Sequence, residues 1–116
     1  MITVYGLKNC DTCRNALKWL EAEGLAHQFH DLRKDGVDEV TIQRWSDAVG
    51  WEMLLNKRGT TWRGLEDAVK EGANEANAAS LMAEHPALIK RPVFVTGEDV
   101  IVGFKDEQKN RLTGQE

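Results

Sequence analysis

The stretch ITVYGLKNCDTCR, residues 2–14, decides how this sequence folds, because it places Cys10 and Cys13 between a strand pattern and a helix pattern. Residues 2–5 are β-branched or aromatic and end at Gly6, which is typical of a short strand. Apolar side chains then recur at helical spacing, at Cys13, Ala16, Leu17 and Leu20. We therefore expect a strand, a Cys-x-x-Cys pair and a helix that stops near Gly24.

A second strand and a second helix follow the first pair. Residues 26–32 read as a strand with Phe29 as its central large apolar residue. A strand–helix–strand order implies a right-handed parallel crossover. Further apolar residues mark an amphipathic helix that ends at Gly50, and these are Val37, Val40, Trp45, Ala48 and Val49.

Residues 51–88 differ from the rest of the chain in their low β-propensity. They contain a polar turn at 56–61 and an alanine-rich stretch at 73–84, and helix formers are frequent among them. This composition predicts a compact helical insertion.

The C-terminal part has the pattern of a β-hairpin followed by a helix. Residues 93–95 and 100–102 read as strands joined by a turn at 97–99, and residues 105–112 as a short helix. Without the insertion, the element order is that of the thioredoxin fold. We therefore expect one α/β domain over residues 1–116, with a thioredoxin-like fold and a helical insertion.

Composition excludes several classes of protein. The 116 residues are 41% hydrophobic and 29% charged, which argues against disorder. A net charge of −4 argues against direct binding of nucleic acid through a basic face. We see neither a secretion signal nor a membrane span, so we expect a cytoplasmic protein. We also expect it to be a monomer.

The two cysteines have the spacing and position of a redox dithiol. A helix N-terminus stabilises a thiolate through its free N–H groups and its dipole, and Lys8 and Arg14 add positive charge nearby. These features predict Cys10 as the attacking thiol and Cys13 as the resolving thiol. The alternative is that the cysteines are inert small hydrophobic residues, Cys13 more readily than Cys10 because it matches a core position.

A zinc site is a second alternative, because Cys10-x-x-Cys13 and His27-x-x-His30 come close to a Cys₂His₂ pattern. However, His27 and His30 lie in an expected strand, where side chains three positions apart point to opposite faces. We therefore expect no metal site.

Four segments in this order resemble the ArsC/Spx/YffB family: residues 6–14 (GLKNCDTCR), 56–61 (NKRGTT), 85–93 (HPALIKRPV) and 102–104 (VGF). The family comprises glutaredoxin-coupled arsenate reductases, Spx-type redox regulators and arsenate reductase-related proteins of unassigned role. The resemblance covers nearly the whole chain and implies a thioredoxin-like fold with a helical insertion.

The same resemblance implies site residues. Cys10 matches the reactive cysteine, and Arg91 matches the arginine that helps hold an oxyanion near it. The peptide bond before Pro92 is implied to be cis and to face the cysteine. We expect Lys8, Arg58 and Pro92 to contribute to substrate binding. Alternatively, the arginines are ordinary surface residues and Pro92 is a trans proline at a strand start.

Three departures from the arsenate reductases argue against arsenate as the substrate. Those enzymes carry a histidine shortly before the reactive cysteine, where this chain has Gly6. Their insertion arginine aligns nearer Asn56 than Arg58, and a further arginine after the hairpin is replaced by the segment 102–104. In these features the chain is closer to the YffB and Spx branches.

Three functions follow as hypotheses. We expect a thiol-dependent reductase that uses Cys10 as nucleophile, binds no cofactor, and takes glutathione or glutaredoxin as reductant. The alternative is an Spx-type regulator that binds a protein partner such as RNA polymerase through a Cys10–Cys13 thiol/disulfide switch. The third is a thioredoxin-like fold that has lost activity.

Overall fold

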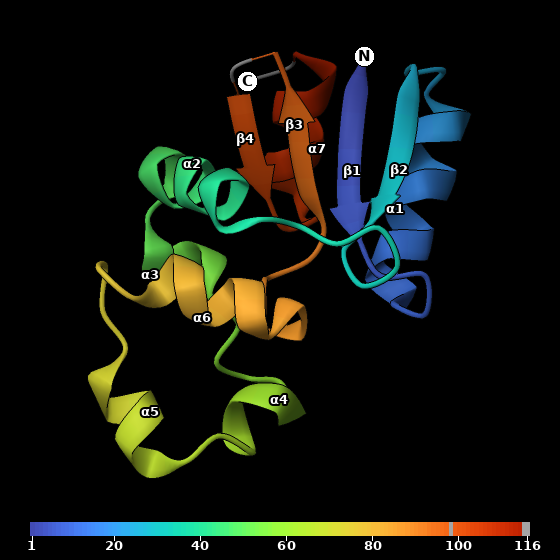
Figure 1. Cartoon of the computed structure of the whole chain (residues 1–116). Coiled ribbons are helices and arrows are strands. Elements are labelled where there is room, and N and C mark those ends of the chain that lie inside the picture. The colour runs from blue at the N-terminus through green and yellow to red at the C-terminus, as the bar shows by residue number, and fades with distance from the viewer. Residues whose placement is uncertain (98, 115–116) are drawn as a thin grey trace. The chain divides into compact units, whose positions relative to one another are not determined.

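One four-stranded mixed sheet forms in the part of the chain that contains both cysteines (Figure 1). The strand order is β2-β1-β3-β4, with β1 (Ile2–Gly6), β2 (His27–Asp31), β3 (Val93–Thr96) and β4 (Asp99–Val102). β1 pairs in parallel with β2 and antiparallel with β3, which pairs antiparallel with β4. The parallel pair and the hairpin that the sequence predicts are thus both present in this computed structural model, which describes residues 1–97 and 99–114.

Tertiary contacts divide the chain into two units. The first consists of residues 1–35 and 91–116, and the second of residues 36–90. The first unit holds the sheet together with helices α1 (Asp11–Ala22) and α7 (Asp106–Thr113). The organisation of residues 1–116 as a single domain stays a prediction.

The core of the first unit joins the sheet to α1. Alternate residues of β1 are buried, as a strand with one buried face requires. The buried cluster consists of Ile2, Val4, Ala16, Leu20, Phe94 and Ile101. Phe104, just before α7, packs edge-on against Trp19 of α1, with 5.7 Å between ring centroids. This packing fixes α1, and with it the cysteines at its N-terminal end.

The second unit is helical. It contains α2 (Glu39–Val49), α3 (Trp51–Leu54), α4 (Thr60–Arg63), α5 (Asp67–Gly72), α6 (Ala78–Glu84) and a 3₁₀ turn, η1 (Pro86–Leu88). Its buried side chains include Ile42, Trp45, Leu54, Met82 and Leu88. α2 packs against both α3 and α6, so the apolar stripe of α2 is covered within its own unit.

Several local predictions for this unit are wrong. Val40 and Ala48 were expected on the apolar face of α2 but are exposed, Val40 to 61%, and Val37 lies before the start of the helix at Glu39. The buried stripe runs instead through Ile42 and Trp45, and a residue two positions before Ile42 lies on the opposite side of a helix. The expected polar turn at 56–61 is shorter, because α4 already begins at Thr60.

The C-terminal part follows the expected order. The Arg91–Pro92 peptide bond is cis, as the family resemblance implies. Of the expected turn at 97–99, Gly97 has a φ of 60°, and Glu98 lies outside the described residues. Within the described part of the chain, no helix has the length and apolar character that crossing a membrane requires.

Candidate functional site

Cys10 is the N-cap residue of α1 and Cys13 lies in its first turn. The Cys10 backbone is extended, with φ −98° and ψ 120°, and its N–H donates to the carbonyl of Leu7 at 3.1 Å. Its carbonyl accepts from the N–H of Arg14 at 3.0 Å, which is the first hydrogen bond of the helix. Both cysteines are free thiols, Cys10 half-buried and Cys13 buried. Cys10 therefore stands at the N-terminal end of α1, where the helix dipole favours a negative charge.

The pKa of Cys10 lies below the ordinary value for a thiol. Partial burial, the largest single influence, acts to raise this pKa, but four interactions together outweigh it. Hydrogen bonding from Cys13, followed by hydrogen bonding from the Arg91 guanidinium and its positive charge, lowers this pKa. Each of these favours the thiolate, which is the nucleophilic form of cysteine.

The pKa of Cys13 is shifted in the opposite direction. Burial raises it to about 12, and the negative charge of the neighbouring Cys10 sulfur contributes, although a backbone N–H from Leu7 opposes the shift. Cys13 is therefore a protonated thiol at neutral pH, and its S–H is a hydrogen-bond donor to Cys10. The pKa values of the two cysteines are thus displaced in opposite directions, so Cys10 ionises at a lower pH than Cys13.

Gly6, at the end of β1, is a site residue whose role the sequence did not indicate. A Cβ atom at this position would overlap the Sγ of Cys13 and would lie 3.3 Å from its Cβ and 3.5 Å from Cε1 of Phe29. The space for the Cys13 side chain exists only because residue 6 has no side chain. The strand pattern explained Gly6 only as an end of the strand, since its contact with Cys13 depends on the packing of α1.

Asp31, at the end of β2, is a second residue that sequence reasoning missed. Its carboxylate accepts hydrogen bonds from the backbone N–H groups of Arg33 and Lys34, both at 2.8 Å, and of Lys8 at 3.3 Å. These hydrogen bonds lower the pKa of Asp31, and the bond from the N–H of Lys34 has the largest effect. An aspartate at the end of a strand is a known turn signal. Its bond to Lys8, in the loop before Cys10, joins residues 23 positions apart.

A small cavity brings together three of the expected site residues. It has a volume of about 190 Å³, and Lys8, Cys10 and Arg91 line it together with Leu7, Asn9, Asp31 and Arg33. Pro92 follows Arg91 directly and is buried. The cavity therefore places a low-pKa thiol among cationic side chains.

The remaining expected residues are described within the unit to which each belongs. Arg58 belongs to the second unit, where it is exposed in the loop before α4 and its N–H donates to Oδ1 of Asn56 at 3.0 Å. Its role in substrate binding stays a prediction. His27 and His30 both lie in β2, as expected. Among residues 1–97 and 99–114, no three His, Cys, Asp or Glu side chains gather as a metal site would require.

Comparison with known proteins assigns the family. The ArsC family model matches residues 5–112, which is nearly the whole chain. The chain belongs to the ArsC family. The resemblance inferred from the cysteine loop and three downstream segments is thereby confirmed, and so is the α/β thioredoxin-like fold.

Two solved structures are similar to this chain along most of their length. A solved structure of a YFFB protein has a TM-score of 0.91 and 39% identity, covering 97% of this chain and 98% of the other. An arsenate reductase (ArsC) related protein from Brucella melitensis has a TM-score of 0.77 and 43% identity, covering 95% and 92%.

Two curated relatives extend the comparison. An uncharacterized protein from Haemophilus influenzae is 44% identical over 108 residues, 93% of this chain and 95% of that protein. The global transcriptional regulator Spx 2 from Bacillus anthracis is 28% identical over 112 residues, 93% of this chain and 83% of that protein. ArsC-related proteins and Spx regulators are therefore both relatives of this chain.

Proposed function

We propose that this ArsC-family protein is a thiol-dependent reductase with Cys10 as its nucleophile. The observation that carries the proposal is the environment of the Cys10 sulfur. It lies at the N-terminus of α1, in a cavity that Arg91 also lines, and its pKa is lowered by hydrogen bonding from Cys13 and Arg91 and by the charge of Arg91. Thiol–disulfide exchange needs an accessible thiolate, and a neighbouring arginine favours that form of Cys10.

The reaction proceeds in two exchanges. The Cys10 thiolate attacks one sulfur of a substrate disulfide, a Cys10–substrate S–S bond forms, and the other sulfur leaves as a thiolate. The Cys13 thiol then gives up its proton and attacks the Cys10 sulfur. This step forms the Cys10–Cys13 disulfide and releases the second substrate thiol. Two molecules of glutathione, or one glutaredoxin dithiol, reduce this disulfide and are themselves oxidised.

The raised pKa of Cys13 suits its place in this order. Cys13 stays protonated while Cys10 attacks, so it stabilises the Cys10 thiolate by donating a hydrogen bond. Once Cys10 forms a mixed disulfide, its sulfur is no longer charged and no longer raises the pKa of Cys13. An alternative second step has glutathione attack the mixed disulfide directly, with Cys13 remaining a hydrogen-bond donor.

Cationic side chains are the candidates for binding the substrate. Arg91 and Lys8 line the Cys10 cavity and offer donors to a carboxylate or oxyanion on the substrate. We assign a supporting role to Pro92, next to Arg91, and to Arg58 in the second unit. The proposal places this chemistry in the cytoplasm, where glutathione and glutaredoxin are available, and in a monomer.

A single-turnover experiment tests the proposal. The reduced protein is mixed with oxidised glutathione, and mass spectrometry follows its adducts. The Cys13→Ser variant should accumulate one glutathione on Cys10, whereas the unmodified protein should proceed to the Cys10–Cys13 disulfide. The Cys10→Ser variant should form no adduct. Equal adduct formation with Cys10→Ser would contradict the assignment of the nucleophile.

The Spx relatives support a second candidate function. The 28% identity to Spx 2 and the pair of free thiols fit a regulator whose affinity for a partner such as RNA polymerase changes when Cys10 and Cys13 form a disulfide. Binding of reduced and oxidised protein to purified RNA polymerase distinguishes the candidates. A redox-dependent affinity without turnover of disulfides would favour the regulator.

A further inference from the structure

A second and larger cavity adjoins the one that contains Cys10. Its volume is about 530 Å³, and residues of the first unit alone line it, from the loop before α1, from α1, and from the end of β2 with the residues after it. Leu7, Lys8 and Asp31 line both cavities, so the two meet at the loop that leads into Cys10. A group bound in the larger cavity would therefore lie beside the reactive sulfur.

The wall of this cavity is apolar. Leu7, Cys13, Leu17 and Phe29 contribute to it. Leu17 and Phe29 pack against the core of the first unit but remain half-buried, so they present apolar surface to the cavity. Covering that surface with an apolar side chain would remove both partners from water, which favours binding.

Charged side chains also line the cavity. Three of them are cationic, Lys8, Arg14 and Lys34, and two are anionic, Asp31 and Asp35. Both carboxylates already accept backbone N–H groups: Asp31 from the loop residues described above, and Asp35 from the N–H of Asp31 at 3.2 Å. Among the described residues, neither Lys8 nor Lys34 forms an ion pair. Their ammonium groups are therefore available to a carboxylate of a ligand.

We propose that this cavity is a specificity subsite for disulfide-bonded peptides or proteins in which an apolar residue follows the reactive cysteine and an acidic residue lies beside it. The apolar side chain occupies the space between Leu17 and Phe29, and the acidic side chain pairs with Lys8 or Lys34. The inference rests on the proposed reductase function and names its substrate class as acidic, apolar peptide disulfides.

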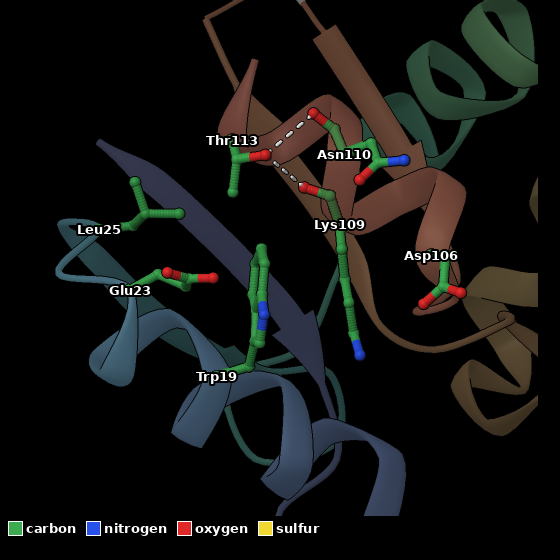
Figure 2. A pocket seen from close by; sticks show the side chains of 7 residues that line it. All are labelled: Trp19, Glu23, Leu25, Asp106, Lys109, Asn110 and Thr113. Carbon is green, nitrogen blue, oxygen red and sulfur yellow. Dashed lines mark hydrogen bonds between the residues drawn. The ribbon is translucent and has the colours of Figure 1, made fainter. Parts of the chain in front are cut away.

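A third cavity, at the opposite end of α1, provides the control (Figure 2). It measures about 420 Å³ and lies between the C-terminal end of α1 and α7. Figure 2 shows Leu25 and Trp19 on one side and the polar residues of α7 on the other, with Thr113 Oγ1 donating to the carbonyls of Lys109 and Asn110. Leu25, like Leu17, is a half-buried leucine packed on the same core. It is therefore a matched position away from Cys10.

The experiment uses two peptides, acetyl-Glu-Cys-Leu-Gly amide and acetyl-Glu-Cys-Ser-Gly amide, each as a mixed disulfide with thionitrobenzoate. The Cys10 thiolate attacks the peptide sulfur, a Cys10–peptide disulfide forms, and coloured thionitrobenzoate leaves. The leaving group is the same for both peptides, so the ratio of their rate constants reports on the Leu side chain alone. The mixed disulfide of glutathione with thionitrobenzoate is measured in parallel.

We expect the Leu peptide to react about tenfold faster than the Ser peptide, because a leucine side chain moves from water into an apolar site. The Leu17→Gln variant should bring this ratio close to one, Leu17→Met should retain it, and Leu25→Gln should leave it unchanged. Thermal unfolding of each variant verifies that it is folded.

The outcomes separate the two proposals. A ratio near one in the unmodified protein, with normal reaction of the glutathione disulfide, would overturn the subsite and leave the reductase function in place. A ratio that persists in Leu17→Gln would overturn the assignment to this cavity. Failure of Cys10 to react with any of the three disulfides would overturn the reductase function and the subsite together.

Discussion

Cys10 and Cys13, one helical turn apart, have pKa values that are displaced in opposite directions. The S–H of Cys13 stabilises the Cys10 thiolate, and the negative charge of Cys10 in turn holds the proton on Cys13. Arg91 adds positive charge to the same sulfur. At the scale of the residue, the two cysteines therefore differ in the electrostatics of their surroundings as well as in their position on α1.

Replacement of Arg91 tests its share in this arrangement. Arg91→Ala should raise the pKa of Cys10, because the guanidinium hydrogen bond and charge are lost, and should slow alkylation of Cys10 at neutral pH about tenfold. Arg91→Lys keeps the positive charge, so its Cys10 pKa and alkylation rate should lie between those of the unmodified protein and of Arg91→Ala. The measurement is the rate of iodoacetamide labelling against pH, with Arg44→Ala as an exposed control. An unchanged profile in Arg91→Ala would remove Arg91 from the site.

Gly6 and Cys13 should be coupled energetically. Gly6→Ala should lower the free energy of unfolding by about 1–3 kcal/mol, because the new Cβ overlaps the Cys13 sulfur. In a Cys13→Ala background the same change should cost much less. Gly72→Ala, whose Cβ would meet nothing within 4 Å, is the control. Denaturant unfolding measures the stability of the two single variants and of the double variant. If the losses of stability from the changes at Gly6 and Cys13 simply add, the contact is absent.

Sequence reasoning found those site residues whose chemistry is carried by the side chain itself. Cys10 and Lys8 lie in the loop that opens α1, and Arg91 was found through the family resemblance. Gly6 and Asp31 were missed because their roles are set by contacts across the fold, Gly6 with the first turn of α1 and Asp31 with the loop at Lys8. A residue with no side chain, or one bonded to backbone, leaves a weak signal in a single sequence.

The elements matter because they hold the loop before Cys10 in place. The end of β2 reaches this loop through Asp31, while the core clamps α1 through Ala16 and Leu20. Helix and strand boundaries agreed well with the sequence pattern where Gly residues end them, as at Gly24 and Gly50. In the second unit, where short helices follow one another, the periodicity predicted Val40 on the buried face of α2, and the predicted polar turn was longer than the observed one.

The hydrogen bonds that Asp31 accepts should make the stability of the protein depend on pH. The pKa of Asp31 is lowered in the folded state, so its stabilising contribution is complete above the unfolded value of about 4 and is lost as pH falls through the folded pKa. Asp31→Asn, which cannot ionise, should be less stable than the unmodified protein at neutral pH, and the gap should close in acid. Urea unfolding at several pH values measures this difference in stability. A difference that does not depend on pH would show that the ionised carboxylate of Asp31 does not stabilise the fold.

At the scale of the whole molecule, the chain carries a net charge of −4, yet the surroundings of Cys10 are rich in cations. Lys8, Arg33 and Arg91 line the cavity of the reactive sulfur, with Asp31 as the acidic residue among them. A local positive field on an acidic protein concentrates anionic substrates at the site and raises their association rate. This distribution agrees with substrates that carry carboxylates.

The buried Cys13 thiol links global stability to pH. Its pKa is about 12 in the folded state and near 8.5 when unfolded, so its contribution is complete below about pH 8.5 and declines as pH rises towards the folded value. The free energy of unfolding of Cys10→Ser, minus that of Cys10→Ser/Cys13→Ala, should fall above about pH 9, by at most about 1.4 kcal/mol per pH unit. A flat difference would mean that Cys13 is not buried as a thiol.

The most direct test of the central claim is the rate of alkylation of the unmodified protein against pH, with mass spectrometry to identify the modified cysteine. The account predicts that Cys10 reacts with an apparent pKa clearly below the free value of about 8.5, while Cys13 stays unreacted across the neutral range. Similar rates for the two cysteines, both titrating near the free value, would contradict it.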